Sequence, residues 1–473
     1  MIIMVDTVPV SEKLANFSAE TIFEQLPSKT VLMAKRCLLD ALGVTLAAGK
    51  LGEGCAAFIE LACEQGGVPE RTVIGFNRKI PAMLAAFANG SMAHAMDFED
   101  TYDEAVVHPN AASIPAALAV AEARGDINGK QLITAITIGC DIVCRLGLGL
   151  TVPPDDFGWY TPPILGAFGA TASAGHLLGL NPEQMRDAFS IALCQATCSA
   201  EIKYSPNSVV RAVRDAFAAK TGVLSSQLAA RGVAGFDLPF EGKAGFFSIF
   251  SRNNYDPETV IRDLGYRFEI ERVSFKPWPT CRGTHVFIEA ALELARQHHI
   301  NTKEIKHIRA SGDRIMRMLA EPEQQKKHPS TVIDAKFSIP FSVATALCYN
   351  SVTLEHITTQ SITDDNVLEL ADKVTFEVME PADSTMKNVS RGSLTIETTE
   401  GQKLSMLLEH PLGHPDRSLD DEFLINKFKQ CASCSSVSSD ASRLQNIIEC
   451  VLSLEKMDNV SMELMPLLKG NPD

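Results

Sequence analysis

The sequence predicts a mainly α protein with a large all-helical domain and a smaller α+β domain. Three observations support this fold class: helical spacing of apolar residues from about residue 11 to 235, alternating and β-branched runs from about residue 270, and a return to helical patterns after residue 411. At 473 residues, 45% of them apolar, the chain can bury two or three cores. We predict a helical domain over residues 1–268, an α+β domain over 269–410, and a helical segment over 411–473 that packs back on the first domain.

The predicted helices of the first domain are rich in small residues. Residues 27–49 space their apolar side chains at three and four positions and end in a glycine, as an amphipathic helix does. Four further helices are predicted at residues 80–98, 110–125, 129–150 and 166–180, all rich in Ala and Gly. Because small residues let helix backbones approach closely, we expect a compact helical domain with little sheet.

The predicted strands lie in the second domain, at residues 266–279, 303–313, 366–380 and 391–410. Helical patterns separate them at residues 284–299 and 337–351, and another helix is predicted at 441–457. Strands interrupted by helices in this way indicate an α+β domain.

The charge balance excludes one broad class of function. Forty-three basic and 58 acidic residues give a formal net charge of −15, which does not suit a nucleic-acid-binding protein. A basic pocket for a small anion remains possible, because net charge describes the whole surface. The amino terminus lacks the features of a signal peptide, and no apolar run reaches the length of about 18 residues typical of a membrane span. We expect a cytoplasmic protein with no membrane partner.

No cofactor signature is present in the sequence. Of the twelve cysteines, only Cys431 and Cys434 have the C-x-x-C spacing, and no second pair accompanies them, so we expect reduced thiols and no metal. The segment GLGLTV at residues 147–152 has Val152 where a dinucleotide fingerprint needs its third glycine, and no predicted strand precedes it.

Residues 94–109, HAMDFEDTYDEAVVHP, place five carboxylates between His94 and His108 in an otherwise core-like neighbourhood. An unpaired carboxylate is costly in such packing, so we select Asp97, Thr101 and His108 as candidate functional residues. A histidine near a carboxylate can transfer protons near neutral pH. The more ordinary interpretation, acids that face water at a helix start, is the one we favour for three of the other carboxylates, Glu99, Asp103 and Glu104.

Three other stretches carry candidate residues. Lys276, Arg282 and His285 lie in SFKPWPTCRGTH, where cations and a helix start suit a carboxylate, although a solvated proline-rich connection would have the same composition. Tyr160 precedes a small-residue helix and is either an active-site group or a packing aromatic. Arg211 and Arg214 are predicted on one side of a helix that also holds Lys220, as an anion clamp or an ordinary exposed face.

Taken in order, these stretches resemble the MmgE/PrpD family over about residues 11–460. The most specific motifs are HAMDFEDT with HPNAASIPAALAVAEA, GKAGFF at 242–247, KPWPTCRGTH at 276–285 and PLGHP at 411–415. The family includes 2-methylcitrate dehydratase, cis-aconitate decarboxylase and iminodisuccinate epimerase. The resemblance implies a homodimer, no metal or organic cofactor, and an active site between the two domains.

Residue by residue, the resemblance implies an active site that includes Asp97, Thr101 and His108, with Lys276 from the second motif. Arg282 and His285 are expected near the substrate carboxylates. Two positions depart from the family pattern: Tyr160 stands where relatives commonly have a histidine, and Arg211 and Arg214 replace a lysine and a histidine. An arginine does not lose its proton in proteins, so these changes alter the proton-transfer groups available.

The expected chemistry is proton transfer at a carbon next to a carboxylate. His108, assisted by Asp97, would act as base or acid, and Tyr160 would be the opposing acid. The carboxylate oxygens would be bound by four cations, Arg211, Arg214, Lys276 and Arg282. We expect a cofactor-independent lyase for a small di- or tricarboxylic acid, a dehydratase or decarboxylase. An epimerase of a small dicarboxylate and a non-catalytic binding protein on the same fold are the alternatives.

Overall fold

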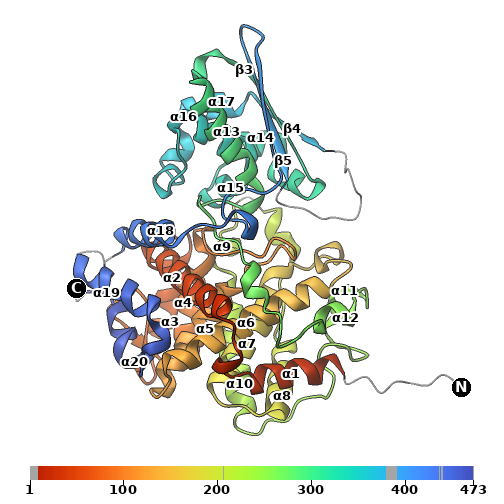
Figure 1. Ribbon diagram of the computed structural model, residues 1–473, viewed down its shortest axis with the longest axis vertical. Helices are drawn as coiled ribbons and strands as arrows, with labels where there is room; N and C mark the ends of the chain where they lie inside the picture. Colours follow the sequence, from red (N-terminus) through yellow and green to blue (C-terminus); the bar gives the residue numbers. More distant parts are fainter. Residues whose placement is uncertain (1–8, 206, 380–390, 436, 438–439, 472–473) are drawn as a thin grey trace, which may run out of the picture.

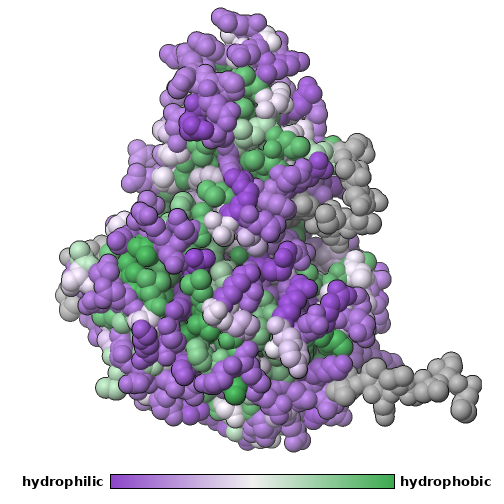
Figure 2. All heavy atoms as spheres, viewed as in Figure 1, coloured by the Kyte–Doolittle hydropathy of each residue, from purple (hydrophilic) through white to green (hydrophobic). Residues whose placement is uncertain are grey.

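The computed structural model describes residues 9–205, 207–379, 391–435, 437 and 440–471. It has two lobes, a broad helical body and a smaller lobe built on a sheet (Figure 1). This arrangement confirms the predicted fold class, mainly α with a smaller α+β domain. Hydrophilic side chains cover most of the face seen in Figure 2.

The helical body contains the first twelve helices and one small hairpin. The helices are α1 (Val10–Glu20), α2 (Ser28–Leu51), α3 (Cys55–Glu64), α4 (Ala82–Ala95), α5 (Asn110–Arg124), α6 (Gly129–Gly149), α7 (Thr161–Leu177), α8 (Pro182–Leu193), α9 (Val210–Val213), α10 (Asp215–Ala229), α11 (Phe246–Ser251) and α12 (Pro257–Ile261). The hairpin pairs β1 (Arg71–Thr72) with β2 (Lys79–Ile80).

Small residues at the crossing points let the central helices pack closely. A Cβ added to Gly139 of α6 would lie 2.0 Å from Ser173 Oγ of α7, and one added to Gly222 of α10 would lie 2.5 Å from the Ala170 carbonyl carbon of α7. The Ala- and Gly-rich composition therefore has the packing role expected from the sequence. By contrast, Gly49 does not end α2, which continues to Leu51.

One helix, α6, is the only one among the described residues that is long and apolar enough to cross a membrane by length and composition. It lies within the helical body, where nearly all of its residues are buried. Its Asp141 and Arg145 form a buried ion pair 2.5 Å apart, and Arg145 also donates to three backbone carbonyls. These contacts make α6 a core helix of the body.

The smaller lobe is a four-stranded sheet with helices against it. Its strands are β3 (Ile305–Gly312), β4 (Val374–Val378), β5 (Gly392–Thr398) and β6 (Lys403–Leu408), in the order β4-β3-β5-β6, with β3 parallel to β4 and the other pairs antiparallel. Its helices are α13 (His285–His298), α14 (Glu323–Lys327), α15 (Val332–Lys336), α16 (Ile339–Tyr349) and α17 (Asp365–Ala371).

Two strand predictions need correction. Residues 266–279 are not a strand: they contain the 3₁₀ helix η4 (Glu269–Arg272), because the Glu269 backbone N–H donates to the Asp141 side chain instead of to a sheet neighbour. Residues 366–380 divide into α17 and β4, since Asp364 caps the start of α17 by accepting from the Asn366 N–H. Residue 380 lies outside the described residues.

The C-terminal segment returns to the helical body. It forms α18 (Asp421–Ser433), α19 (Ala441–Leu452) and α20 (Val460–Glu463), and α18 packs along α2 (Figure 1). A buried ion pair joins the two helices, with Lys427 Nζ of α18 2.6 Å from Asp40 Oδ1 of α2. The same ammonium donates to the Phe98 carbonyl oxygen, so α18 also holds the segment that follows α4.

Candidate active site between the two lobes

A cavity of about 320 Å³ lies between the helical body and the smaller lobe. Side chains from both lobes line it, and five of the nine residues selected from the sequence are among them: Thr101, His108, Tyr160, Arg211 and Arg282. They come from elements up to 181 positions apart in the chain, so the fold itself assembles the site. The other four residues, Asp97, Arg214, Lys276 and His285, are buried behind this first layer.

The loop between α4 and α5 carries most of the polar groups of the site. Asp97 has φ 48°, in the left-handed region, and turns the chain sharply after α4. Further along, the Thr101 backbone exchanges two hydrogen bonds with Ser274, of 2.9 and 2.7 Å. This backbone bridge joins the loop to the segment that carries Lys276, so the two motifs of the sequence lie side by side.

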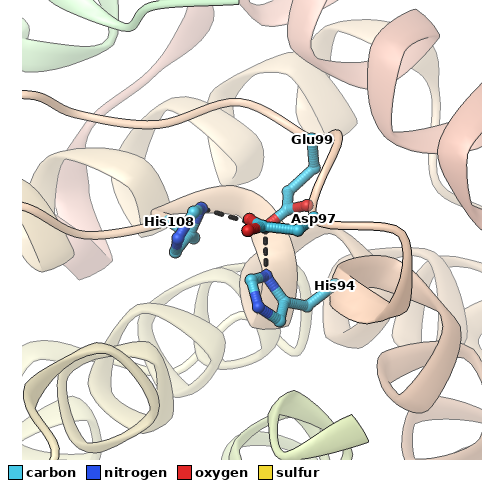
Figure 3. Close-up of side chains that lie close together, drawn as sticks. All are labelled: His94, Asp97, Glu99 and His108. Atoms are coloured by element: carbon cyan, nitrogen blue, oxygen red, sulfur yellow. Dashed lines mark hydrogen bonds and ion pairs between the residues drawn. The ribbon is translucent and has the colours of Figure 1, made fainter. Parts of the chain in front are cut away.

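Glu99 bridges two histidines at the centre of the site (Figure 3). Its Oε1 atom lies 2.9 Å from His108 Nδ1 and also contacts His94 Nδ1. The Asp100 carbonyl oxygen is a second acceptor for His108 Nδ1, at 3.1 Å. Because both neighbours of Nδ1 are acceptors, neutral His108 carries its proton there and keeps its Nε2 lone pair available.

The interpretation of Glu99 as a solvated acid was therefore wrong. The side chain is 1% exposed. Burial alone would raise the pKa of Glu99, but the neighbouring His94, Lys276 and His108 hold it well below its usual range. Burial, with the nearby Arg214 charge, lowers the pKa of His94 to about 4, so His94 is neutral near pH 7. Glu99 is thus a buried carboxylate that accepts from both imidazoles.

Asp97 pairs with Lys276, and not with His108 as the sequence analysis expected. Lys276 Nζ donates to the Asp97 carbonyl oxygen at 2.9 Å and also to its carboxylate Oδ1. Burial would raise the pKa of Asp97, but the Lys276 ammonium and the adjacent histidines hold it below its usual range. The carboxylate next to His108 Nδ1 is that of Glu99, two residues further along the loop than Asp97.

Asp100 is a third buried carboxylate of the loop, and its electrostatics differ. Its Oδ2 accepts from Asn110 Nδ2 at 3.0 Å. Burial raises the pKa of Asp100 to about 8, and the charges of Asp40 and Glu99 add to the effect. Asp100 is therefore a neutral carboxylic acid near pH 7, whereas Glu99 beside it in the chain is ionised.

The two remaining acids of the loop differ in exposure. Asp103, expected to face water, is buried and paired with Arg282, whose Nη2 lies 3.1 Å from Asp103 Oδ2. Glu104 is partly exposed, as expected, and pairs with Arg272. Of Glu99, Asp103 and Glu104, only Glu104 thus matches the solvated interpretation, because Glu99 is buried against two histidines and Asp103 against Arg282.

Tyr160 stands among three cations. The charged ends of Lys203, Arg211 and Arg214 lie 5.4, 5.8 and 5.1 Å from its ring centroid. Lys203 is already paired with Asp155, whereas Arg211 stacks on Phe337, 3.4 Å from that ring centroid. Arg211 lines the cavity with a guanidinium that this stacking holds in place.

Arg211 and Arg214 do not share one continuous helix as predicted. The helix breaks at Arg214, between α9 and α10, and Arg214 Nη1 donates to the Arg211 carbonyl oxygen that the break exposes. Arg214 is 1% exposed and does not line the cavity. Its charge lies close enough to lower the pKa of His94, after the larger effect of burial.

His285 is fully buried, one layer behind Arg282. Its Nδ1 accepts from Arg282 Nη1 at 3.4 Å, and its Nε2 donates to the Thr280 carbonyl oxygen at 3.2 Å. Burial, followed by the charges of Arg282 and Lys276, keeps the pKa of His285 well below its usual range. In this arrangement His285 orients Arg282 and does not itself face the cavity.

Lys336 is a buried lysine beside the α4–α5 loop that was not predicted from the sequence. It ends α15 in the smaller lobe, and its Nζ donates to the Ala95 carbonyl oxygen at 2.9 Å, directly before the loop. Burial lowers the pKa of Lys336 to about 8. Its surrounding sequence, VIDAK, resembles any short helix end, so no local signal marks it; only the packing of the two lobes brings it to the loop.

Four side chains of the site offer possible metal ligands: His94, Asp97, Glu99 and His108, with ligand atoms within 4.8 Å of one another. The Lys276 ammonium already occupies this position beside Asp97, and its charge repels a divalent cation. Both imidazoles also direct Nδ1 at Glu99. The donor set fits an internally hydrogen-bonded network better than a metal centre.

Comparison with known proteins identifies the family to which the chain belongs. Residues 12–258 match the MmgE/PrpD N-terminal domain, and residues 278–453 match the MmgE/PrpD C-terminal domain. An Aspergillus oryzae protein named cis-aconitate decarboxylase-like protein oryM is 28% identical over 98% of this chain and 97% of its own length. Human cis-aconitate decarboxylase is 26% identical over 94% of this chain and 91% of its own length. Escherichia coli 2-methylcitrate dehydratase is 25% identical over 84% of each chain. The two domain matches span most of the sequence, and the chain belongs to the MmgE/PrpD family.

Proposed function

We propose that the protein is a cofactor-independent lyase that removes carbon dioxide or water from a small di- or tricarboxylic acid. The observation that carries the proposal is the placement of His108, backed by Glu99, in one cavity with Tyr160, Arg211 and Arg282. Proton-transfer groups and carboxylate-binding cations in one enclosed space are what proton transfer next to a carboxylate requires. Relatives named as decarboxylases and dehydratases support the reaction class.

His108 is the proposed base or acid. Its Nδ1–H faces Glu99 and the Asp100 carbonyl, so its Nε2 is the nitrogen left to exchange a proton with substrate. Glu99 stabilises the imidazolium formed when Nε2 takes a proton, as a buried carboxylate does for a catalytic histidine. Glu99 thereby takes the role of the carboxylate partner of His108, which was predicted for Asp97 from the sequence.

Arg211 and Arg282 are the proposed carboxylate-binding groups. Both guanidiniums line the cavity and are held in place, Arg211 by Phe337 and Arg282 by Asp103. A guanidinium fixed in this way loses little side-chain entropy when it binds a carboxylate in two parallel hydrogen bonds. Lys276 and Arg214, which lie one layer deeper, contribute their charge to the carboxylates of the network.

Tyr160 is the proposed second proton-transfer group. In a dehydration, His108 takes the proton next to the carboxylate and Tyr160 gives a proton to the departing hydroxyl. In a decarboxylation, the electron pair of the broken carbon–carbon bond remains on the substrate, and one of the two groups protonates the carbon. An epimerase would use the same two groups on opposite faces of one carbon. A tyrosine at position 160, in place of the histidine of relatives, is compatible with this alternative.

Incubation with cis-aconitate, 2-methylcitrate and related acids, followed by NMR of the products, tests the proposal. The expected result is loss of carbon dioxide or water from at least one acid. Inversion of a stereocentre without either loss would identify the epimerase. Saturable binding of these acids without conversion would support the non-catalytic alternative and contradict the proposal.

Variants connect such turnover to the site. His108→Asn and Tyr160→Phe should each lower kcat by about 10²-fold or more, the usual scale for a positioned acid or base. Matched changes outside the cavity, His356→Asn and Tyr255→Phe, should leave kcat near the wild-type value. Full activity of Tyr160→Phe would make Tyr160 a packing residue and would remove the second proton-transfer group from the mechanism.

We also propose a cytoplasmic homodimer, formed through the helical body. Several large apolar side chains of that body are exposed in the single chain, among them Tyr204, Val210 and Phe217, at 70%, 46% and 46%. Val210 and Phe217 lie on the consecutive helices α9 and α10. An apolar face of this kind suits a self-complementary interface.

A further inference from the structure

The cavity has an apolar wall that the proposed chemistry does not use. Proton transfer and carboxylate binding occupy His108, Tyr160 and the two arginines, yet large apolar side chains line the same space. Two of these belong to the helical body and four to the smaller lobe: Val106, Leu150, Ile315, Met316, Met318 and Leu319. A fully polar substrate would leave this wall against water.

The wall contains both buried and partly exposed side chains. Met316 and Leu319 are 1% and 2% exposed on the 3₁₀ helix η7 (Arg314–Leu319), whereas Ile315 is 39% exposed. Val106, which lines the same cavity from the helical body, is 41% exposed. Apolar surface that faces a cavity is stabilised when an apolar ligand displaces the water there. Both lobes thus offer apolar side chains to one occupant of the cavity.

The backbone at Val106 is strained in a way that keeps this side chain at the cavity. Its φ is 55°, a left-handed value that a β-branched residue rarely adopts. Strain of this kind persists where the surrounding structure fixes it, and it concentrates at ligand sites. Here the Tyr102 and Val107 backbones fix the turn through hydrogen bonds of 2.8 and 3.4 Å.

We propose that the substrate carries an apolar chain of several carbons, which lies against the wall formed by Val106, Ile315 and Met318 while its carboxylates face Arg211 and Arg282. The inference rests on the proposed function for the carboxylate end of the substrate. It narrows the substrate class from small polycarboxylates in general to carboxylic acids that carry an alkyl chain of several carbons.

Binding of a chain-length series tests the inference without any turnover. Succinate and its 2-methyl, 2-butyl and 2-hexyl derivatives share the carboxylates and have no group to eliminate. Isothermal titration calorimetry should show Kd falling about fourfold for each added methylene, the value of burying one such group. A Kd that stays constant or rises along the series would overturn the inference.

Two variants locate the chain in the cavity. Ile315→Asn should reduce the gain per methylene, and Val106→Asn should do the same while tolerating the left-handed backbone, since asparagine adopts it readily. Ile22→Asn, the same change at an isoleucine that is 54% exposed outside the cavity, should leave the gain unchanged. An unchanged gain in both cavity variants would place the chain elsewhere and contradict the inference.

Turnover separates this inference from the proposed function. If unsaturated acids with and without an alkyl chain are converted at equal kcat/KM and the binding series is flat, the inference fails while the proposed function holds. If Kd falls along the series but no acid is converted, the proposed function fails while the apolar subsite stands.

Discussion

At the scale of single residues, Glu99 determines how His108 can act. The two groups are 2.9 Å apart, and Glu99 is enclosed by cations and imidazoles that keep it ionised. Removing the charge while keeping the shape, as in Glu99→Gln, should therefore destabilise the His108 imidazolium. We expect kcat to fall by about 10²-fold, by the general scale of acid–base catalysis.

The pH profile distinguishes this role from a structural one. Glu99→Gln removes a negative charge 2.9 Å from His108 Nδ1, so the acidic limb of the kcat/KM profile should move to lower pH. Glu293→Gln, a matched change at a partly exposed glutamate of α13 outside the cavity, should shift neither kcat nor the profile. A Glu99→Gln enzyme with reduced kcat and an unmoved acidic limb would limit Glu99 to packing.

Asp100 makes a prediction about stability. The pKa of this carboxyl is about 8 in the folded protein and about 3.9 when unfolded, so between these values the unfolded chain has released a proton that the folded chain keeps. Its contribution to the unfolding free energy is therefore fully retained below pH 4 and lost as pH rises, by about 1.4 kcal/mol per pH unit up to pH 8.

Asp100→Asn removes this titration while still offering an oxygen to Asn110. Urea unfolding of wild type and variant from pH 5.5 to 8 should show the difference in unfolding free energy growing with pH in favour of the variant. A constant difference across this range would mean that Asp100 ionises normally in the folded protein.

At the scale of elements, the segment after β6 packs through Gly413 against the stretch that carries Lys276. This glycine has φ +86°, and a Cβ added there would lie 1.9 Å from the Phe275 carbonyl oxygen. The Phe275 N–H in turn donates to the Gly413 carbonyl oxygen at 3.0 Å, directly before Lys276. The family motif PLGHP thus has a packing reason for its glycine.

Gly413→Ala should destabilise the protein for two separable reasons. The left-handed backbone costs about 1–2 kcal/mol for any residue with a Cβ, and the contact with Phe275 adds a similar steric cost of about 1–3 kcal/mol. Gly401→Ala isolates the cost of the left-handed backbone, because Gly401 has φ +87° and no atom lies within 4 Å of the added Cβ. Equal losses of unfolding free energy in the two variants would show that the close approach to Phe275 relaxes without cost.

At the scale of the whole molecule, the proposed dimer is open to direct measurement. Light scattering at micromolar concentration should give a mass about twice the 51.3 kDa of one chain. Phe217→Asp should shift this mass toward the single chain, because Phe217 is 46% exposed and stands edge-on to Phe58 and Phe87 in an aromatic cluster of the helical body. Tyr266→Asp, at an 89% exposed tyrosine, is the control. A wild-type mass of one chain would contradict the dimer.

The sequence by itself determined the fold class and the residues worth examining. Helical periodicity and β-alternation act over neighbouring positions, so they predicted a helical domain and a sheet-containing domain, and the motif resemblance pointed to Asp97, His108 and Arg282. Local patterns failed where a distant contact decided the outcome: residues 266–279 contain η4 and no strand, because Asp141, more than 120 positions earlier, accepts from the Glu269 N–H.

Only the tertiary structure decided which charges pair. Glu99, Asp100 and Asp103 are close in sequence and alike in chemistry, yet one accepts from two histidines, one is a neutral acid and one holds Arg282. Their differences arise from burial and from partners that other elements supply, and no pattern within the loop encodes these. Lys336 and the apolar wall of the cavity likewise come from the smaller lobe, because the free energy of a buried charge or an apolar contact depends on what surrounds it in space, whatever the separation along the chain.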